Sequence, residues 1–231
     1  NGEMVIRDEQ LMKWPRPEAD VKTMLAEYYR YISFLDLQIG RVLDALRALD
    51  PSGQTIVVLW SDHGLLLGEH AIWGKHCLYE NSLRSPLLIR APGLAHPGAT
   101  SAALVETVDI FPTLTDLCGL PAPAGLDGRS LRPQLDRPAT PAAKPARGFW
   151  TDGQRTIRSE RWRLIASRAA DGSPQFELFD YANDPLETRN HAATQPEILR
   201  DLRAQLALRP ELPASSGKSS GKKKSAASLP P

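Results

Sequence analysis

The sequence predicts an α/β protein that ends in a small β-rich unit. Three observations point to this class. A long helical pattern leads directly into a continuous β-branched run, a second strand and helix follow, and short alternating segments separated by turn residues fill the C-terminal part. With 231 residues, 42% of them hydrophobic and 24% charged, the chain has the composition of an ordinary globular protein of one large or two small domains.

The first predicted element is a long amphipathic helix from Asp20 to Leu49. Its apolar residues recur at steps of three and four, which is the period of one helical face. Pro51-Ser52-Gly53 ends the helix and turns the chain. The apolar positions are Val21, Met24, Leu25, Tyr28, Tyr29, Ile32, Leu35, Ile39, Val42, Leu43 and Leu46.

A strand is expected directly after this helix. Thr55 to Trp60 is a continuous run of β-branched and other apolar residues. Such a run is typical of a strand buried on both faces in a mainly parallel sheet. Ser85 to Arg90 predicts a second strand, because proline is permitted near a strand's start. Thr107 to Leu117 predicts a helix that Gly119 closes.

The pattern changes in the C-terminal part of the chain. A stretch rich in Pro, Ala and Gly, residues 121–145, predicts an irregular connector. Alternating segments at 154–158, 162–166 and 175–180 then predict short antiparallel strands, and 196–208 predicts a last helix. We therefore expect three parts: an α/β part at 1–145, a small β-rich subdomain with the terminal helix at 146–212, and a disordered Ser, Lys and Pro tail at 213–231.

Charge and cysteine content exclude several classes of function. Lys plus Arg number 28 and Asp plus Glu number 27, so the net charge of +1 gives no electrostatic reason to expect nucleic acid as a partner. No apolar run is long enough to span a bilayer, and the first residues lack the features of a signal peptide, so we expect the start to be internal to a longer protein. Two cysteines, Cys77 and Cys118, are too few for a disulfide framework or a structural zinc site, and whether they pair is open.

Residues that can carry chemistry concentrate after the first predicted strand. Asp62 and His63 follow it directly, at the strand end that borders the ligand crevice of an open α/β sheet. His70, Lys75 and His76 come next along the chain. Such a mixture suits a metal bound beside an oxyanion, with the lysine neutralising negative charge. Each residue alone also fits an ordinary role in a hydrogen-bonded turn, a polar loop or a solvated surface.

Several longer sequence motifs include this segment and continue along the chain after it. They are Ser61-Asp62-His63-Gly64, Gly68-Glu69-His70, Trp73-Gly74-Lys75-His76, Leu78-Tyr79-Glu80, Arg84-Ser85-Pro86, Leu126-Asp127-Gly128-Arg129 and Asn183-Asp184-Pro185-Leu186-Glu187. Together these phrases resemble the type I sulfatases, in particular members similar to iduronate-2-sulfatase and choline sulfatase. The resemblance runs from the first helix to about His191.

The resemblance implies an alkaline-phosphatase-like α/β/α sandwich, of which this chain is a part, with a small C-terminal antiparallel β subdomain. It also implies hydrolysis of a sulfate ester, with a sulfated small molecule or glycan as substrate and one divalent cation, usually calcium, as cofactor. At the matching positions, Asp62 and His63 are expected to bind the metal. Lys75 is expected to contact the sulfate oxygens, and His76 to border the substrate.

The nucleophile of the family is a formylglycine made from the cysteine of a Cys-x-Pro/Ala-x-Arg motif. Neither Cys77, followed by Leu78-Tyr79-Glu80-Asn81, nor Cys118, followed by Gly119-Leu120-Pro121-Ala122, fits this motif. In the family it lies upstream of the long helix. We therefore expect a C-terminal portion of a sulfatase that holds part of the metal site, binds metal weakly and has no turnover by itself, and whose sheet edge and core are left open.

Two other interpretations remain open. A phosphatase, phosphodiesterase or phosphonate monoester hydrolase of the same superfold is one, because Asp-His at a strand end also suits zinc or manganese. A non-catalytic remnant without a nucleophile is the other. Localisation is open between export, to a periplasm or the outside of the cell, and the cytoplasm.

Overall fold

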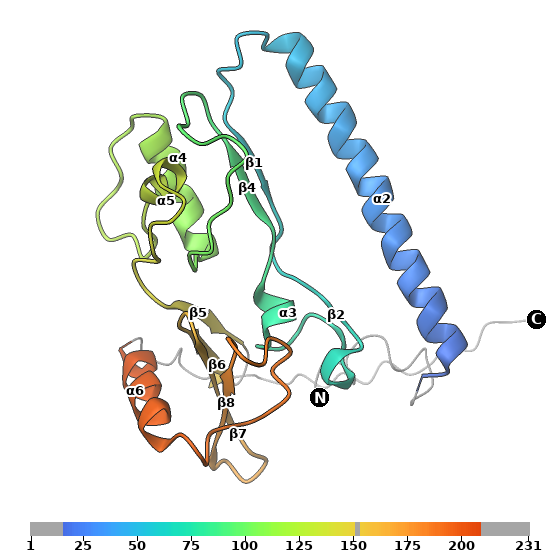
Figure 1. Ribbon diagram of the computed structural model, residues 1–231, viewed down its shortest axis with the longest axis vertical. Helices are drawn as coiled ribbons and strands as arrows, with labels where there is room; N and C mark the ends of the chain where they lie inside the picture. The colour runs from blue at the N-terminus through green and yellow to red at the C-terminus, as the bar shows by residue number, and fades with distance from the viewer. Residues whose placement is uncertain (1–15, 151–152, 209–231) are drawn as a thin grey trace, which may run out of the picture.

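The computed structural model describes residues 16–150 and 153–208. This described part begins with one long helix, continues through a narrow strand pair and its loops, and closes with a four-stranded sheet covered by a helix (Figure 1). The tail predicted at 213–231 lies outside the described residues.

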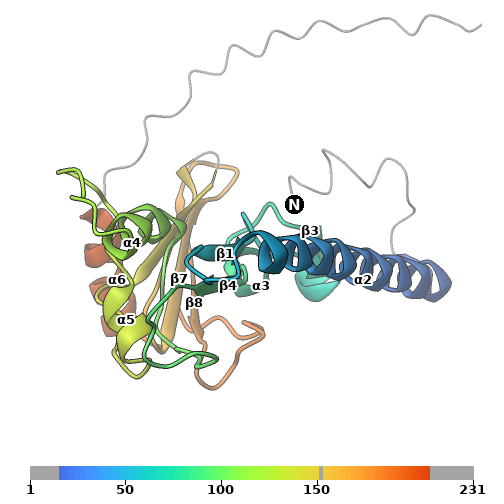
Figure 2. The same ribbon diagram turned by 90° about the horizontal axis from the view of Figure 1, so that it is seen from above.

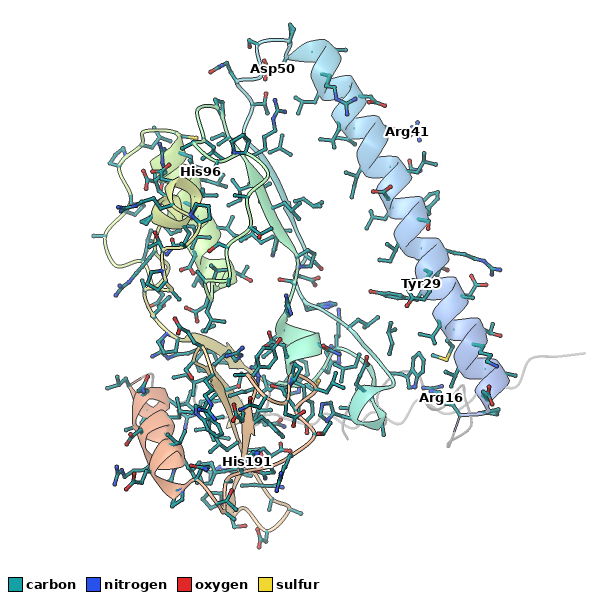
Figure 3. All side chains as sticks on the ribbon, viewed as in Figure 1. Arg16, Tyr29, Arg41, Asp50, His96 and His191 are labelled. Atoms are coloured by element: carbon teal, nitrogen blue, oxygen red, sulfur yellow. The ribbon has the colours of Figure 1, made fainter. Side chains whose placement is uncertain are left out.

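The long helix is confirmed as α2, Glu18–Leu49. None of its side chains is buried, and Figures 1 and 2 show it standing apart from the rest of the described chain. In Figure 3 the side chains of Tyr29 and Arg41 project from it without another element beside them. The predicted apolar face is therefore present but uncovered in the described residues.

The strand pair corrects one prediction. β1, Val57–Trp60, pairs with β4, Leu87–Arg90, and the pairing is antiparallel. The prediction of a strand buried on both faces in a mainly parallel sheet was wrong for these residues, since Trp60 is 49% exposed and Leu88 58% exposed. An apolar run indicates that a strand has apolar faces, but it carries no information on the direction of the neighbouring strand or on what covers it.

Between β1 and β4 the chain forms a compact loop. A short hairpin of β2, Leu66–Leu67, and β3, Trp73–Gly74, encloses the 3-10 turn η1, Glu69–Ala71, and is followed by the one-turn helix α3, Glu80–Leu83. Figure 1 shows α3 between the strand pair and the C-terminal sheet. This loop carries most of the predicted site residues.

The segment after β4 contains two helices. The helix predicted at 107–117 is confirmed as η2, Thr107–Asp109, continued by α4, Ile110–Leu117. The connector predicted to be irregular contains one short helix, α5, Arg132–Asp136, which Pro133 helps to start. Buried Asp109 accepts hydrogen bonds from the backbone of Glu106 and of Arg129, at 2.8 Å each, and so ties the connector to the start of the helix.

The C-terminal subdomain is an antiparallel sheet in the order β5-β6-β7-β8. Three strands match the predicted ones, and β5 was not predicted. The strands are β5, Ala146–Phe149, β6, Arg155–Arg158, β7, Trp162–Arg168, and β8, Pro174–Asp180, and the last helix is α6, Pro196–Ala207.

The two faces of this sheet have different partners. Ile157, Leu164 and Leu178 pack on one face against Leu202 and Leu206 of α6. On the other face, Ile165 and Phe179 pack with Leu78, just before α3. The C-terminal sheet therefore supports the loop between β1 and β4 from below in Figure 1. No helix within residues 16–150 and 153–208 is long and apolar enough to cross a bilayer.

Candidate functional site

Three of the four predicted site residues lie together. Asp62 and His63 follow β1, and Lys75 follows β3. The His63 Nε2 atom lies 2.5 Å from Lys75 Nζ and 3.2 Å from Asp62 Oδ2. The hairpin between them reverses the chain, which brings Lys75 back to the end of β1. The structure therefore brings these three side chains into one cluster.

The hydrogen bonds of His63 assign the role of each ring nitrogen. Nδ1 lies 2.7 Å from the Gly64 carbonyl oxygen, which can only accept, so Nδ1 carries the hydrogen and donates it. Nε2 then accepts from the Lys75 ammonium. The Gly64 carbonyl thereby orients the imidazole with its Nε2 lone pair toward Lys75.

The cluster is open on its carboxylate side. The Asp62 side chain is 71% exposed, whereas that of His63 is 31% exposed. A cation can therefore reach the Asp62 oxygens from solvent.

Ser82 holds the two segments of the cluster together. It is 1% exposed; its carbonyl accepts the Gly64 N–H at 2.7 Å, and its hydroxyl donates to the Lys75 carbonyl. Gly64 leaves no room for a side chain here, because an added Cβ would lie 2.1 Å from the Asn81 carbonyl oxygen. The glycine is therefore required by the close approach of two backbones, since its φ is not in the left-handed region.

Buried charges anchor α3, which carries Ser82, to the C-terminal subdomain. The Glu80 backbone N–H donates to the Glu187 carboxylate at 2.7 Å. Arg163 of β7 pairs with both carboxylates: its Nε lies 2.5 Å from Glu187 Oε1, and its other end contacts Glu80. Arg158 Nε lies 3.6 Å from Glu80. Glu80 and Glu187 occur in the motifs that resemble the sulfatases, but the sequence alone assigned no role to either residue.

Glu187 is held in an unusual environment. It is 2% exposed and its φ of 55° is in the left-handed region, which a non-glycine residue adopts only when its surroundings compensate. Burial raises the pKa of its carboxyl, while the Arg163 charge acts in the opposite direction. The contacts with Arg163 and with the start of α3 supply the compensation.

His76, the fourth predicted residue, stacks on Trp150 with ring centroids 4.6 Å apart, and partial burial lowers the pKa of its imidazole. His70 stacks on Tyr79 at 3.8 Å, and the Tyr79 hydroxyl donates to Glu177 at 3.1 Å. Burial, followed by the Glu177 charge, raises the Tyr79 pKa. Both histidines thus line the wall between the loop and the C-terminal sheet.

Neither cysteine forms a disulfide. Cys77 is half-buried, and desolvation raises the pKa of its thiol, which disfavours the reactive thiolate. Cys118 is exposed, at the C-terminal end of α4.

The donor set fits part of a metal site. Asp62 offers the carboxylate oxygens that a hard divalent cation prefers, and His63 offers one nitrogen. Across residues 16–150 and 153–208, no group of three or more His, Cys, Asp or Glu side chains is arranged to hold a metal ion. A calcium ion with six to eight oxygen ligands would therefore need further ligands from elsewhere.

Two protein-family models match this chain. The model described as N-sulphoglucosamine sulphohydrolase, C-terminal, matches residues 68–210, and the model described as Sulfatase matches residues 6–120. Together they include the cluster, α3 and the C-terminal sheet.

Individual relatives agree with these models. A protein named Sulfatase from Formosa agariphila is 35% identical over 182 residues, which cover 78% of this chain and 34% of that protein. Arylsulfatase K of Homo sapiens is 34% identical over 200 residues, covering 81% of this chain and 37% of that protein. This chain therefore spans roughly a third of the length of each relative, 34% and 37%.

Solved structures show the same likeness. The structure of BT4656 in complex with its substrate D-glucosamine-2-N,6-O-disulfate matches with a TM-score of 0.70 and 30% identity, over 77% of this chain and 38% of that one. The phosphonate monoester hydrolase of Agrobacterium radiobacter matches with a TM-score of 0.67 and 30% identity, over 80% of this chain and 42% of that one. These likenesses confirm the expected fold, as part of an alkaline-phosphatase-like α/β domain.

Proposed function

This chain belongs to the type I sulfatase family, and we propose that it supplies part of the metal and sulfate site of a sulfuric ester hydrolase. The observation that carries the proposal is the contact of Asp62, His63 and Lys75 at the end of β1. A carboxylate and an ammonium that each lie close to one oriented imidazole suit a singly charged sulfate ester bound beside a cation.

Lys75 is the proposed sulfate ligand. Its ammonium donates up to three hydrogen bonds, of which the contact with His63 Nε2 uses one. The leaving-group oxygen of the ester gains negative charge as its bond to sulfur breaks, and a fixed cation beside it lowers the energy of that state. Ser82 holds the Lys75 backbone in place for this role.

Asp62 and His63 would hold the divalent cation, for which we propose calcium. When bound, such a cation polarises the ester oxygens and offsets their charge. His63 Nε2 points at Lys75 here, so ligation through this atom requires the Lys75 ammonium to turn toward the substrate oxygens. We propose that the nucleophile, a formylglycine, and the remaining metal ligands come from another segment of the protein.

The proposed substrate is a sulfated small molecule or glycan. A protein similar to this chain was solved with a disulfated glucosamine that is its substrate. By itself, the 231-residue chain is expected to bind calcium weakly and to show no turnover, because two ligands make only part of a calcium site.

The direct test is sulfate release by the protein expressed from its complete reading frame. Substrates are an aryl sulfate and D-glucosamine-2-N,6-O-disulfate. We expect hydrolysis that Lys75→Met lowers by about 10²- to 10³-fold in kcat, the usual effect of removing one group that stabilises transition-state charge. Arg189→Gln, an exposed arginine of the C-terminal subdomain, is the matched control and should leave kcat unchanged. Full activity of the Lys75→Met variant would contradict the proposed role.

Phosphonate monoester hydrolysis is the second candidate, because a phosphonate monoester hydrolase is among the similar structures. The same assay with a phenyl phosphonate ester separates the two reactions. Melting temperatures in calcium, zinc and manganese give an independent criterion, since a cation that binds the folded state raises the melting temperature. Stabilisation by zinc or manganese without calcium, together with phosphonate turnover, would favour the second candidate.

A further inference from the structure

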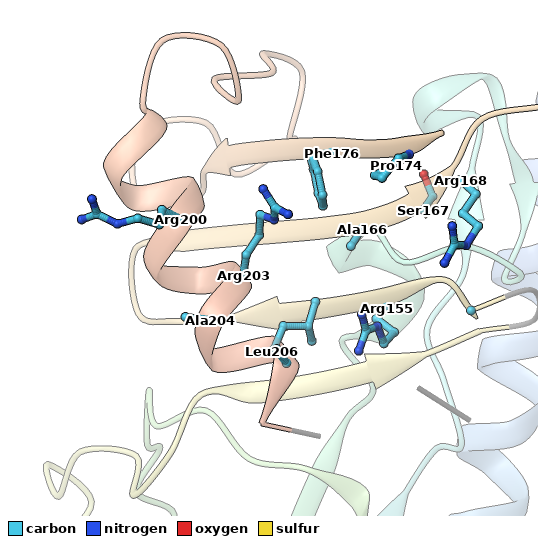
Figure 4. A pocket seen from close by; sticks show the side chains of 12 residues that line it. Arg155, Ala166, Ser167, Arg168, Pro174, Phe176, Arg200, Arg203, Ala204 and Leu206 are labelled. Atoms are coloured by element: carbon cyan, nitrogen blue, oxygen red, sulfur yellow. The ribbon is translucent and has the colours of Figure 1, made fainter. Parts of the chain in front are cut away.

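A second concave site lies on the opposite face of the C-terminal sheet from Asp62, His63 and Lys75. Along β7, Ile165 packs toward Leu78, on the side of the candidate site, whereas Leu164 and Ala166 pack toward α6. A pocket of about 520 Å³ opens between α6 and this outer face (Figure 4). This volume lies within the range of small-molecule sites, which is about 300–1,000 Å³.

All charged side chains among the described residues that line this pocket are arginines. They come from three elements: Arg155 from β6, Arg168 from the end of β7, and Arg200 and Arg203 from α6. The chain as a whole carries a net charge of only +1, so this gathering is a local feature and does not follow from composition. A concave surface with this charge concentrates anions.

Existing contacts orient these side chains. The Arg203 guanidinium lies 4.3 Å from the centre of the Phe176 ring, and Arg168 donates to the Gly172 carbonyl at 3.2 Å. Figure 4 shows Arg203 over the sheet beside Phe176, while the Arg200 guanidinium points away, toward solvent. Arg200 also donates to Asp201 at 3.3 Å. Arg168 and Arg203, which these contacts hold at the pocket, are therefore the side chains placed to meet a ligand.

Guanidinium groups select the chemistry of that ligand. A planar fork of N–H donors matches the paired oxygens of a sulfate or a carboxylate, and stacking on an aromatic ring leaves the donor edge of Arg203 exposed. We propose that this pocket binds a sulfate-bearing segment of an acidic oligosaccharide, at a distance from the group held by Lys75. The proposal rests on the proposed function, because a sulfated glycan is then present at the candidate site as well.

Such a pocket would retain a polymeric substrate between successive reactions. The sheet separates the two sites, so one oligosaccharide must pass around its edge to touch both. A monosaccharide is too short for this, and the pocket is therefore expected to matter for longer chains only.

The experiment is calorimetric titration of the 231-residue chain with a fully sulfated heparin tetrasaccharide. Ionic strength is about 0.15 M, at which exposed charges far from the ligand are largely screened. The double variant Arg168→Gln/Arg203→Gln should bind at least about tenfold more weakly, a loss that two charge-assisted contacts readily account for. Both side chains are exposed, so the fold should persist, which circular dichroism checks. Arg189→Gln, exposed and outside the pocket, should bind as the native chain does.

Three results would overturn the proposal that this pocket binds a sulfated oligosaccharide. One is unchanged binding by the double variant, and another is equal binding of a desulfated tetrasaccharide. The third is loss of binding in Lys75→Met alone, which would assign the oligosaccharide to the candidate site and leave the proposed function intact. Conversely, loss of binding in the double variant together with no sulfate release by the full-length protein would support the pocket while refuting the proposed function.

Discussion

Gly64 shows how one residue determines the geometry of the candidate site. Replacing it with alanine would place a methyl group 2.1 Å from the Asn81 carbonyl oxygen, which is backbone and cannot rotate away. We expect Gly64→Ala to lower the free energy of unfolding by about 1–3 kcal/mol, the usual cost of overpacking. Thermal and urea unfolding measure this change.

Gly40 provides the matched control for that substitution. It lies within α2, and an added Cβ there would meet no atom within 4 Å. Gly40→Ala should therefore raise stability by about 0.5–1 kcal/mol, because alanine is the better helix residue. Equal effects of the two substitutions would show that the Gly64–Asn81 contact is not close in solution.

Asp180 makes stability depend on pH. Hydrogen bonds from Arg161 lower the pKa of its carboxyl from 3.8 to about 2, and a bond from Asn183 acts in the same direction. A depressed folded-state pKa stabilises the fold above the unfolded value, and this contribution is lost as pH falls. The melting temperature should therefore decline between about pH 4 and pH 2 more steeply in the native chain than in Asp180→Asn. Parallel curves for the two proteins over this interval would contradict the assignment.

At the scale of elements, α3 depends on charges that reach it from the C-terminal sheet. Arg163 is 2% exposed and pairs with Glu80 and Glu187, so Arg163→Met would leave the buried Glu187 carboxylate without its cation. Removing one partner of a buried ion pair costs about 3–5 kcal/mol. We expect a loss of this size in chemical unfolding, and an intermediate loss for Arg163→Lys, which keeps the charge without the planar fork.

Arg161 is the control at this scale. It also pairs with a carboxylate, Asp180, but its side chain is 56% exposed. Exposed pairs contribute about 0–1 kcal/mol, so Arg161→Met should cost far less than Arg163→Met. Comparable losses would mean that burial of the Arg163 pairs is not what makes them important.

The whole molecule leaves a large apolar surface uncovered. Within the described residues, α2 has no buried side chain, and Ile32 is 47% and Leu35 53% exposed. Tyr31, Phe34 and Leu37, which point elsewhere around the helix, are more than 60% exposed, at 71%, 63% and 62%. A helix that is apolar on several faces is typical of a protein interior.

We therefore expect the 231-residue chain to self-associate and to bind the dye ANS. Ile32→Lys/Leu35→Lys should reduce both effects, because it breaks the apolar face with charge. Ala26→Lys/Ser33→Lys adds the same charge on a different side of α2 and should reduce them less. Sedimentation velocity over a range of concentrations measures the association. A native chain that stays monomeric over this range and does not increase ANS fluorescence would contradict the prediction.

The sequence by itself determined the features that depend on neighbouring residues. The long helix, five of the six longer strands, the helices near 107–117 and 196–208, and the grouping of Asp62, His63 and Lys75 follow from local periodicity and from motifs within about fifteen residues. Short hairpins bring such residues together whatever the remainder of the chain does.

Only the tertiary structure decided the features that join distant segments. The antiparallel direction of β1 and β4, the lack of space at Gly64, and the arginine pocket are not encoded in any local pattern. The bond from the Glu80 backbone to Glu187 spans 107 positions, and that from Arg163 to Glu80 spans 83. Such contacts exist because folding brings two buried charges to one place, where each compensates for the desolvation of the other.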